Sequence, residues 1–229
     1  MNQIDLKKLT APPNPWHMLR SMGGVGIVCA LLIVVAFQGT LPRINQNKAE
    51  ALEKAVFQVL PGTKNRATFR VNPDGACEPF QGEARGQRLV YAGFDENNKL
   101  VGIAVEAQGQ GFQDVIRLIY GYSPEKQAVI GYQVLESKDT PGLGDKVEKD
   151  PHFLANFDNL EVPLAPDGGA LQHAIEFVKS GGKQHPWQIE GITGATISSR
   201  AIANIMQKST AEMVPLLTKN LETFQAGQK

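Results

Sequence analysis

The chain opens with a polar leader that is followed by an uninterrupted apolar run. Residues 22–41 contain no charged side chain, and their only clearly polar members are Gln38 and Thr40. A helix of about 20 residues crosses the roughly 30 Å hydrocarbon core of a membrane, whereas the apolar part of a signal peptide has only about 7–15 residues. A cleaved signal peptide and a buried core helix are the alternatives, but no small-x-small cleavage site accompanies the run. The pattern predicts a leader, residues 1–21, and a transmembrane helix, residues 22–41.

The basic residues give little information about how this helix is oriented. Three of them precede the apolar run and three follow it closely: Lys7, Lys8, Arg20, Arg43, Lys48 and Lys54. A long domain can be translocated whatever its charge, and the body after the run has about 185 residues. We therefore expect a cytoplasmic amino terminus and an exported body.

Past the apolar run, the pattern changes to short segments of alternating character. Leu52, Val56 and Leu60 first make a helical stripe, which Pro61 ends, and this predicts a short amphipathic helix. Four segments typical of strands follow, each bounded by turn signals: residues 89–94, 100–107, 115–122 and 128–135. Because short turns join them, these segments predict an antiparallel meander.

Helical periodicity returns in the last third of the chain. One apolar stripe predicts a helix that ends at Gly181: Leu171, Ala174, Ile175 and Val178. A second stripe predicts a last helix, which Pro215 should kink or end: Ile197, Ala201, Ile202, Ile205 and Met206. Strands grouped together with helices after them indicate an α+β domain, with an antiparallel sheet and flanking helices, rather than a doubly wound sheet. We expect this single domain to cover residues 45–229.

Composition excludes several classes of function. The 23 Lys+Arg balance 23 Asp+Glu and are scattered along the chain, so a nucleic-acid partner is not expected. Cys29 and Cys77 are too few for an iron–sulfur cluster, a four-thiolate zinc site or a disulfide framework. The histidines lack metal-ligand spacing, and neither a haem-attachment motif nor a glycine-rich dinucleotide motif is present. No metal site is expected, and any redox chemistry needs a cofactor of another kind.

The most informative stretch is residues 190–199, where a loop rich in glycine and hydroxyl groups leads into the last helix. Small and hydroxyl-bearing residues make up its centre: Thr193, Gly194, Ala195 and Thr196. Free amide groups at the start of a helix, and the positive end of its dipole, favour a bound phosphate. Ser198 or Ser199 could equally cap the helix, so an ordinary capped helix is the alternative to a phosphate site.

A second loop, residues 140–144, has a composition that suits a cofactor wall. Pro141 fixes one backbone angle, and Gly142 and Gly144 permit positive φ. Leu143 can present an apolar face to a flat ring. A purely structural turn is the alternative, since Pro-Gly pairs occur in many loops.

These two stretches resemble motifs of one known family. Residues 190–196, Glu-Gly-Ile-Thr-Gly-Ala-Thr, resemble the flavinylation motif of FMN-binding domains, Asp-x-x-Ser/Thr-Gly-Ala-Thr, with Glu190 in the Asp position. In that family the final threonine carries FMN through a phosphoester bond, which implies that Thr196 is the attachment residue. Residues 139–148 look like the Thr-Pro-Gly-Leu-Gly loop that lies upstream in the same family, and their Gly-Asp-Lys-Val-Glu continuation looks most like the G subunit of the Rnf electron-transport complex.

The resemblance covers the chain from the apolar run to the last helix and implies a set of residues that bind covalent FMN. Besides Thr196, this set comprises both loops and the first turn of the helix: Thr140, Pro141, Gly142, Leu143, Gly144, Thr193, Gly194, Ala195, Ile197, Ser198 and Ser199. Trp187 could stack near the flavin or belong to the core. Lys146 or Lys183 could neutralise a reduced flavin or be solvated.

The resemblance also implies a function. It points to a membrane-anchored electron-transfer subunit of an ion-translocating Rnf-type ferredoxin:NAD oxidoreductase complex, in a bacterial inner membrane, with the FMN domain on the periplasmic side. Its implied partners are other membrane subunits and, during maturation, a flavin transferase. No residue is expected to act as acid, base or nucleophile during turnover. The alternatives are the C subunit of a sodium-translocating NADH:quinone reductase, a non-redox membrane scaffold subunit and a stand-alone flavin reductase, the last disfavoured by the missing dinucleotide motif.

Overall fold

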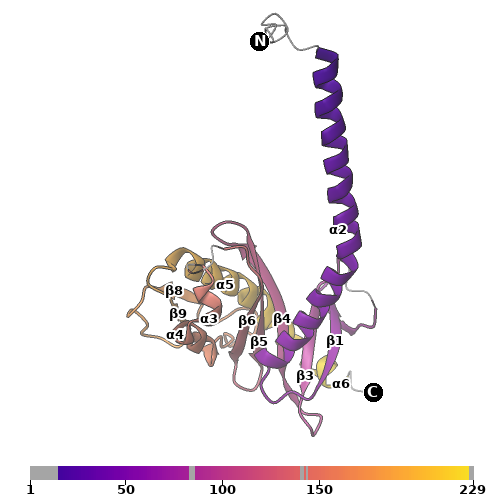
Figure 1. Ribbon diagram of the computed structural model, residues 1–229. Helices are drawn as coiled ribbons and strands as arrows, with labels where there is room; N and C mark the ends of the chain where they lie inside the picture. Colours follow the sequence, from indigo (N-terminus) through magenta and orange to yellow (C-terminus); the bar gives the residue numbers. More distant parts are fainter. Residues whose placement is uncertain (1–14, 83–85, 140–141, 143, 227–229) are drawn as a thin grey trace, which may run out of the picture. The chain divides into compact units, whose positions relative to one another are not determined.

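The structure is a computed structural model that describes residues 15–82, 86–139, 142 and 144–226 (Figure 1). The chain divides into two compact units, Met1–Glu50 and Ala51–Lys229. Most of one long helix, α2 (Pro15–Val59), belongs to the first unit, and its last turns belong to the second.

Helix α2 is long and apolar enough to cross a membrane, and its most apolar stretch is not buried within the chain. This agrees with the predicted transmembrane span. The helix runs without interruption through Pro42 to Val59, so the expectation of a separate amphipathic helix after the span is wrong. The stripe that contains Val56 is instead the end of α2, which stops just before Pro61 as the sequence predicts.

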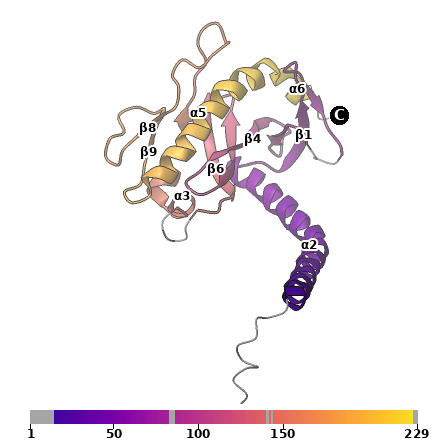
Figure 2. The same cartoon turned by 90° about the horizontal axis from the view of Figure 1, so that it is seen from above.

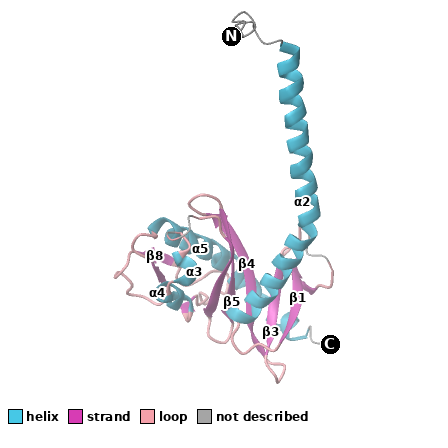
Figure 3. Cartoon of the chain, viewed as in Figure 1, coloured by secondary structure: helices cyan, strands magenta, loops and turns pink. Residues whose placement is uncertain are grey.

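A seven-stranded antiparallel sheet forms the centre of the second unit, with the order β2-β1-β3-β4-β5-β6-β7 (Figure 3). Its strands are β1 (Asn65–Val71), β2 (Cys77–Pro79), β3 (Leu89–Phe94), β4 (Leu100–Gln110), β5 (Val115–Ser123), β6 (Ala128–Glu136) and β7 (Leu160–Glu161). The predicted meander is confirmed, because its four segments are β3 to β6 in sequential antiparallel order.

The strands that the sequence missed lie toward the two edges of the sheet. β1 does alternate with a period of two, because Ala67, Phe69 and Val71 are separated by polar residues, so its pattern could have been found in the sequence. β2 and β7 have only three and two residues, which is too short to show a period.

The prediction of a helix that ends at Gly181 is wrong. Leu171 pairs with Leu164 in an isolated bridge, and β8 (Glu176–Val178) pairs in parallel with β9 (Gln188–Glu190). The backbone carbonyl of Ile175 accepts a hydrogen bond from the Gln207 side chain, 2.9 Å away, as a carbonyl outside a helix must. The spacing of apolar residues here reflects burial of an extended segment and not helical periodicity.

The remaining helices follow the sheet in the chain. They are α3 (Lys146–Lys149), α4 (Pro151–Leu154), the 3₁₀ helix η1 (Ala155–Phe157), α5 (Thr196–Lys219) and α6 (Leu221–Ala226). The predicted last helix is α5, but it does not end at Pro215. Pro215 removes the hydrogen bond to the carbonyl of Ala211, a residue on the exposed side of the helix, so water can take its place.

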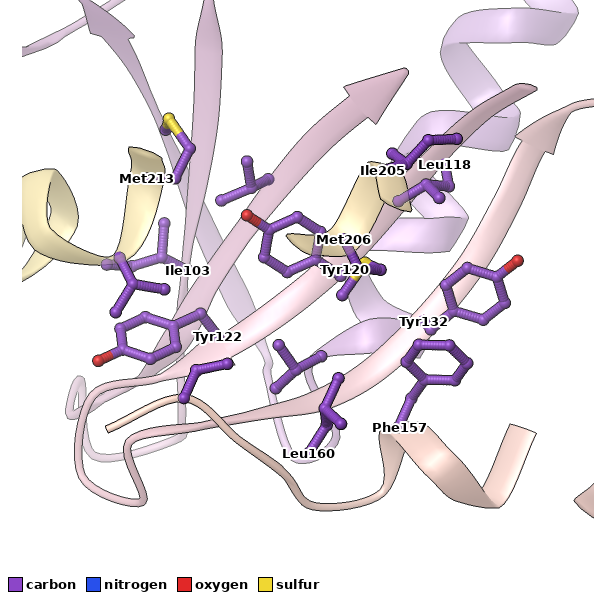
Figure 4. Packing of buried hydrophobic residues seen from close by; sticks show 14 of the residues in the cluster. Ile103, Leu118, Tyr120, Tyr122, Tyr132, Phe157, Leu160, Ile205, Met206 and Met213 are labelled. Atoms are coloured by element: carbon purple, nitrogen blue, oxygen red, sulfur yellow. The ribbon is translucent and has the colours of Figure 1, made fainter. Parts of the chain in front are cut away.

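Helix α5 runs across one face of the sheet, as Figure 2 shows, and packs mainly against β4. On this face Met206 and Ile205 meet Tyr120 and the other large side chains of the main core (Figure 4). The opposite face carries a smaller core, in which Val56 and Val59 of α2 cover Ala104 and Ile119. The sheet is therefore buried on both faces.

Glycines allow the end of α2 to lie directly on the sheet. Gly121 and Gly131 face each other across β5 and β6. A Cβ atom on Gly121 would lie 2.1 Å from the carbonyl oxygen of Val59, and one on Gly131 would lie 2.5 Å from the same oxygen. Leu60 is accommodated in the same way by Gly93 and Gly102, since a Cβ on either would lie 2.8 Å from a Leu60 methyl group. The four glycines form a smooth strip across β3 to β6.

The described part of this domain contains no disulfide. Among the described residues both cysteines are free thiols, and Cys77 is buried. Burial raises the pKa of the Cys77 thiol to about 11, so it stays protonated near neutral pH.

Replacing Gly121 with alanine should destabilise the domain. The new methyl group meets backbone, which cannot rotate away, so we expect the free energy of unfolding to fall by about 2–3 kcal/mol or more. Thermal unfolding of the detergent-solubilised chain by circular dichroism measures this. Gly169→Ala is the matched control, because its nearest neighbour atom would be 3.7 Å away; equal melting temperatures for the two variants would contradict the close approach of α2.

Candidate functional site

The start of α5 places Thr196 at the open end of a helix. Ala195 occupies the N-cap position, and Thr196 is the first helical residue. Its side chain is half-buried, and the contact of its hydroxyl within the described part of the chain is a long one, 3.5 Å, with the carbonyl oxygen of Ile192. The first amide groups of a helix have no partners within the helix, and the positive end of the dipole lies there. The Thr196 hydroxyl is therefore accessible beside a group of free amide donors.

The alternative of a helix capped by Ser198 or Ser199 is wrong. Ala195 has no side-chain cap, and the two serines brace the loop from within. The Ser199 hydroxyl donates to the carbonyl of Ala195 at 2.9 Å and accepts from the amide of Ile192 at 3.2 Å. The Ser198 hydroxyl donates to a carboxylate oxygen of Asp139 at 2.6 Å. Neither serine accepts a hydrogen bond from the amide groups of the first turn, so within the described residues these groups are open to a ligand.

The rest of the 190–196 motif is shaped by close packing. Gly194 has φ +86°, and a Cβ on Gly191 would lie 2.6 Å from the ring of Phe177. The carboxylate of Glu190 accepts a hydrogen bond from the amide of Gly181 and so closes the turn between β8 and β9. The motif's acidic residue thus has a structural role here. Thr193 and Ile197 are exposed.

The second loop lies directly beside the first. Thr140, Pro141 and Leu143 lie outside the described residues, so their predicted roles stay predictions. Gly142 has φ +82°, and its amide donates to the carboxylate of Asp145 at 2.7 Å. A Cβ on Gly144 would lie 2.3 Å from the Cβ of Asp139, so only glycine fits there.

Asp139 joins the two loops to a third segment. Its side chain is only 8% exposed. One carboxylate oxygen accepts from the Ser198 hydroxyl, and the other accepts from the backbone amide of Gln113 at 3.3 Å, in the turn between β4 and β5. The sequence motif included Asp139 but gave no sign of this role.

An apolar hollow of about 320 Å³ opens over Thr196. It is lined by residues from all three segments: Phe112, Asp139, Gly144, Gly194, Ala195, Thr196, Ile197 and Ser198. The structure therefore brings together most of the described residues that the sequence assigned to the site. Phe112 was missed, because a single aromatic residue in a turn carries no motif.

A larger and more polar hollow of about 780 Å³ adjoins the same loop. Its lining includes Thr193, Gly142, Lys146 and Lys149. Lys146 reaches the 190–196 loop, since its Nζ lies 3.9 Å from the position of a Cβ on Gly194. Lys149 is instead paired with Asp145 at 2.8 Å, and its hydrogen bond lowers the pKa of that carboxyl group.

Two other predicted candidates lie elsewhere. Lys183 donates to the side-chain oxygen of Asn156 at 3.1 Å, and burial lowers the pKa of the Lys183 ammonium group. Trp187 is stacked between His173 and His185, with ring centroids 4.0 and 4.4 Å away. None of these residues is among those that line the two hollows described above.

Together, these features fit a flat cofactor tethered by a phosphate. Free amides at the start of α5 and the ammonium group of Lys146 suit the anionic phosphate. The apolar hollow beside Thr196 suits a ring. The charged side chains that line the larger hollow suit the polar atoms of such a cofactor.

Removing the Ser198 hydroxyl should destabilise the site. The buried carboxylate of Asp139 then loses a charge-assisted hydrogen bond, and we expect Ser198→Ala to lower the free energy of unfolding by about 1.5–3 kcal/mol. Thermal unfolding measures the change. Ser180→Ala, which alters an exposed serine, is the control and should change the free energy of unfolding by less than about 0.5 kcal/mol. A Ser198→Ala variant as stable as this control would show that the hydrogen bond from Ser198 to Asp139 contributes nothing to stability.

Comparisons with known proteins agree with this geometry. Residues 111–211 match the family model of the FMN-binding domain. The chain is 28% identical over 190 residues to the G subunit of the ion-translocating oxidoreductase complex of Methanosarcina acetivorans, covering 81% of this chain and 87% of that protein. It is 27% identical over 201 residues to the corresponding G subunit of Escherichia coli K12, covering 84% of this chain and 91% of the relative.

Solved structures share the fold. NqrC of Shewanella oneidensis superposes with a TM-score of 0.55 at 19% identity, covering 79% of this chain and 97% of that one. The C subunit of the Na⁺-translocating NADH-quinone reductase of Parabacteroides distasonis gives a TM-score of 0.56 at 21% identity, with 77% and 96% covered. The predicted α+β fold is confirmed. Residues 111–211 of the chain are thus similar to the FMN-binding domain, and the chain is similar over most of its length to G subunits of ion-translocating oxidoreductase complexes.

Proposed function

We propose that this protein is a membrane-anchored electron-transfer subunit that carries FMN on Thr196 within an Rnf-type ion-translocating oxidoreductase complex. The observation that carries the proposal is the position of Thr196, whose accessible hydroxyl lies at the start of α5 and lines an apolar hollow. The relatives named as G subunits of ion-translocating oxidoreductase complexes support the choice of complex. The electrons are proposed to pass between ferredoxin and NAD.

Attachment requires only the hydroxyl group of Thr196. In the proposed maturation step, a flavin transferase moves FMN from FAD to Thr196: the Thr196 oxygen bonds to the FMN phosphorus, AMP leaves, and the hydroxyl proton is released. The amides of the first turn of α5 then face the phosphate, and the Lys146 ammonium group lies beside the same loop. The residue is consumed once and takes no part in turnover.

Bound FMN supplies one- and two-electron redox chemistry, while the protein positions and tunes it. Here the loop around Gly194 holds the tether, the hollow beside Ala195 excludes water from one side, and Lys146 places positive charge nearby. No proton transfer by a side chain is required. The protein is thus a carrier of electrons between partners.

The proposed setting is a bacterial inner membrane that α2 crosses once, with the FMN domain, residues 45–229, on the periplasmic side and residues 1–21 in the cytoplasm. The length and composition of α2 support the span. The proposed partners are the other membrane subunits of the complex and the flavin transferase.

A C subunit of a sodium-translocating NADH:quinone reductase is the second candidate. The solved structures with this fold favour it, but at 19% and 21% identity they support the fold alone. A non-redox scaffold is less well supported, because it gives no reason for an accessible hydroxyl, free amides and an apolar hollow at one place.

Thr196→Ala should abolish flavin attachment. Wild-type chain from a host that flavinylates other proteins is expected to be heavier by one FMN less one water and to fluoresce in a denaturing gel, whereas Thr196→Ala should show neither property. Thr196→Ser, which keeps a hydroxyl, is the matched control. An unmodified wild type in such a host would overturn covalent attachment.

Lys146→Gln should lower the midpoint potential of the attached flavin. Reduction adds negative charge, which a nearby ammonium group stabilises, so we expect a decrease of roughly 20–60 mV at low salt. Spectroelectrochemical titration of the flavinylated chain measures it. Lys208→Gln removes an exposed lysine from the middle of α5 and should leave the potential unchanged; equal potentials for wild type and Lys146→Gln would show that Lys146 does not tune the flavin.

A further inference from the structure

Few large apolar side chains are exposed among the described residues of the second unit, and two of them lie beside Thr196. Among its described residues, the exposed large hydrophobic side chains are Phe57, Phe112, Val115 and Ile197. Phe112 is 58% exposed and Ile197 is 60% exposed, and both line the apolar hollow over Thr196. Exposed apolar groups that converge on one hollow mark a binding site more often than scattered ones do.

Phe112 is held in place at the tip of the β4–β5 hairpin. The turn is closed by a hydrogen bond from the amide of Gly111 to the carbonyl of Asp114, 2.9 Å long. A Cβ on Gly111 would lie 2.7 Å from Ile116, so the chain is tightly packed next to Phe112. On the other side, the amide of Gln113 donates to the buried carboxylate of Asp139.

Those contacts fix Phe112 relative to the attachment residue. Asp139 holds the amide of Gln113 with one oxygen and the hydroxyl of Ser198 with the other. Phe112 is next to Gln113 in the chain, and Thr196 lies two residues before Ser198. The same carboxylate therefore determines the positions of both sides of the hollow.

From this arrangement we propose that Phe112 and Ile197 form the seat of the flavin ring, with Phe112 stacking against the ring that Thr196 tethers. The inference rests on the proposed function and adds a binding residue from the β4–β5 hairpin, outside both sequence motifs. The isoalloxazine ring is flat and largely apolar on its faces, and aromatic side chains favour stacked or edge contacts with such rings.

The larger hollow is a poorer seat for the ring. Its lining includes five charged side chains, which are Lys146, Lys149, Asp145, Asp150 and Glu190. An apolar ring face placed there would desolvate these groups without pairing them, which is unfavourable. That hollow suits the polar chain and phosphate of the cofactor.

The test measures how well the protein shields the attached flavin from solvent. Full-length wild type, Phe112→Ala and Phe112→Tyr are purified from a flavinylating host, and intact mass establishes that each carries FMN. Iodide quenching of flavin fluorescence is then compared. We expect the Stern–Volmer constant of Phe112→Ala to rise at least threefold, with that of Phe112→Tyr close to wild type. Val115→Ala, which alters an exposed residue of the same hairpin outside the hollow, is the matched control and should resemble wild type.

Each outcome distinguishes this inference from the proposed function. FMN on all variants, with equal iodide quenching in wild type and Phe112→Ala, would overturn the ring seat while leaving the electron carrier intact. The exposed Phe112 would then belong to a surface for a protein partner. Wild type without FMN would overturn both proposals together.

Discussion

The carboxylate of Asp139 is buried, and each of its oxygens accepts a hydrogen bond from a different part of the chain. The amide of Gln113 comes from the β4–β5 turn, and the hydroxyl of Ser198 comes from the first turn of α5. The side chain of Asp139 itself packs against Gly144, where no Cβ atom fits. A buried carboxylate must be satisfied by such donors, since its desolvation is otherwise costly. The three segments that surround Thr196 are thereby held to one another.

The sheet supplies the rigid support behind this contact. α5 packs across one face through its buried side chains, so the position of its first turn is fixed by the core and not by a local cap. The opposite face receives the end of α2, where Gly121 and Gly131 allow direct backbone contact. Because both faces are covered, Thr196 projects from a domain that is rigid beneath it, while the open start of α5 and the ammonium group of Lys146 remain available to an anion.

The sequence predicts the centre of this fold better than its edges. β3 to β6 have clear apolar patterns and short turns, so their order follows directly, whereas β2 and β7 are too short to show a period, and β1 alternates but has only three apolar residues. The pattern before Gly181 predicts a helix wrongly, because apolar residues of an extended chain happen to follow helical spacing there. For the site, the motif locates Thr196 and its neighbours, but contacts between distant segments leave no local pattern. Phe112 and the role of Asp139 therefore emerge only from the structure.

The central claim, that one buried carboxylate assembles the site from three segments, is tested most directly by hydrogen–deuterium exchange of the full-length chain and its Asp139→Ala variant. Loss of the shared acceptor should speed exchange in residues 111–117 and 192–200 together, because both segments depend on the same side chain. Exchange in β3 should be unchanged, which shows that the sheet remains folded. Unaltered exchange in both segments, with β3 intact, would contradict the claim.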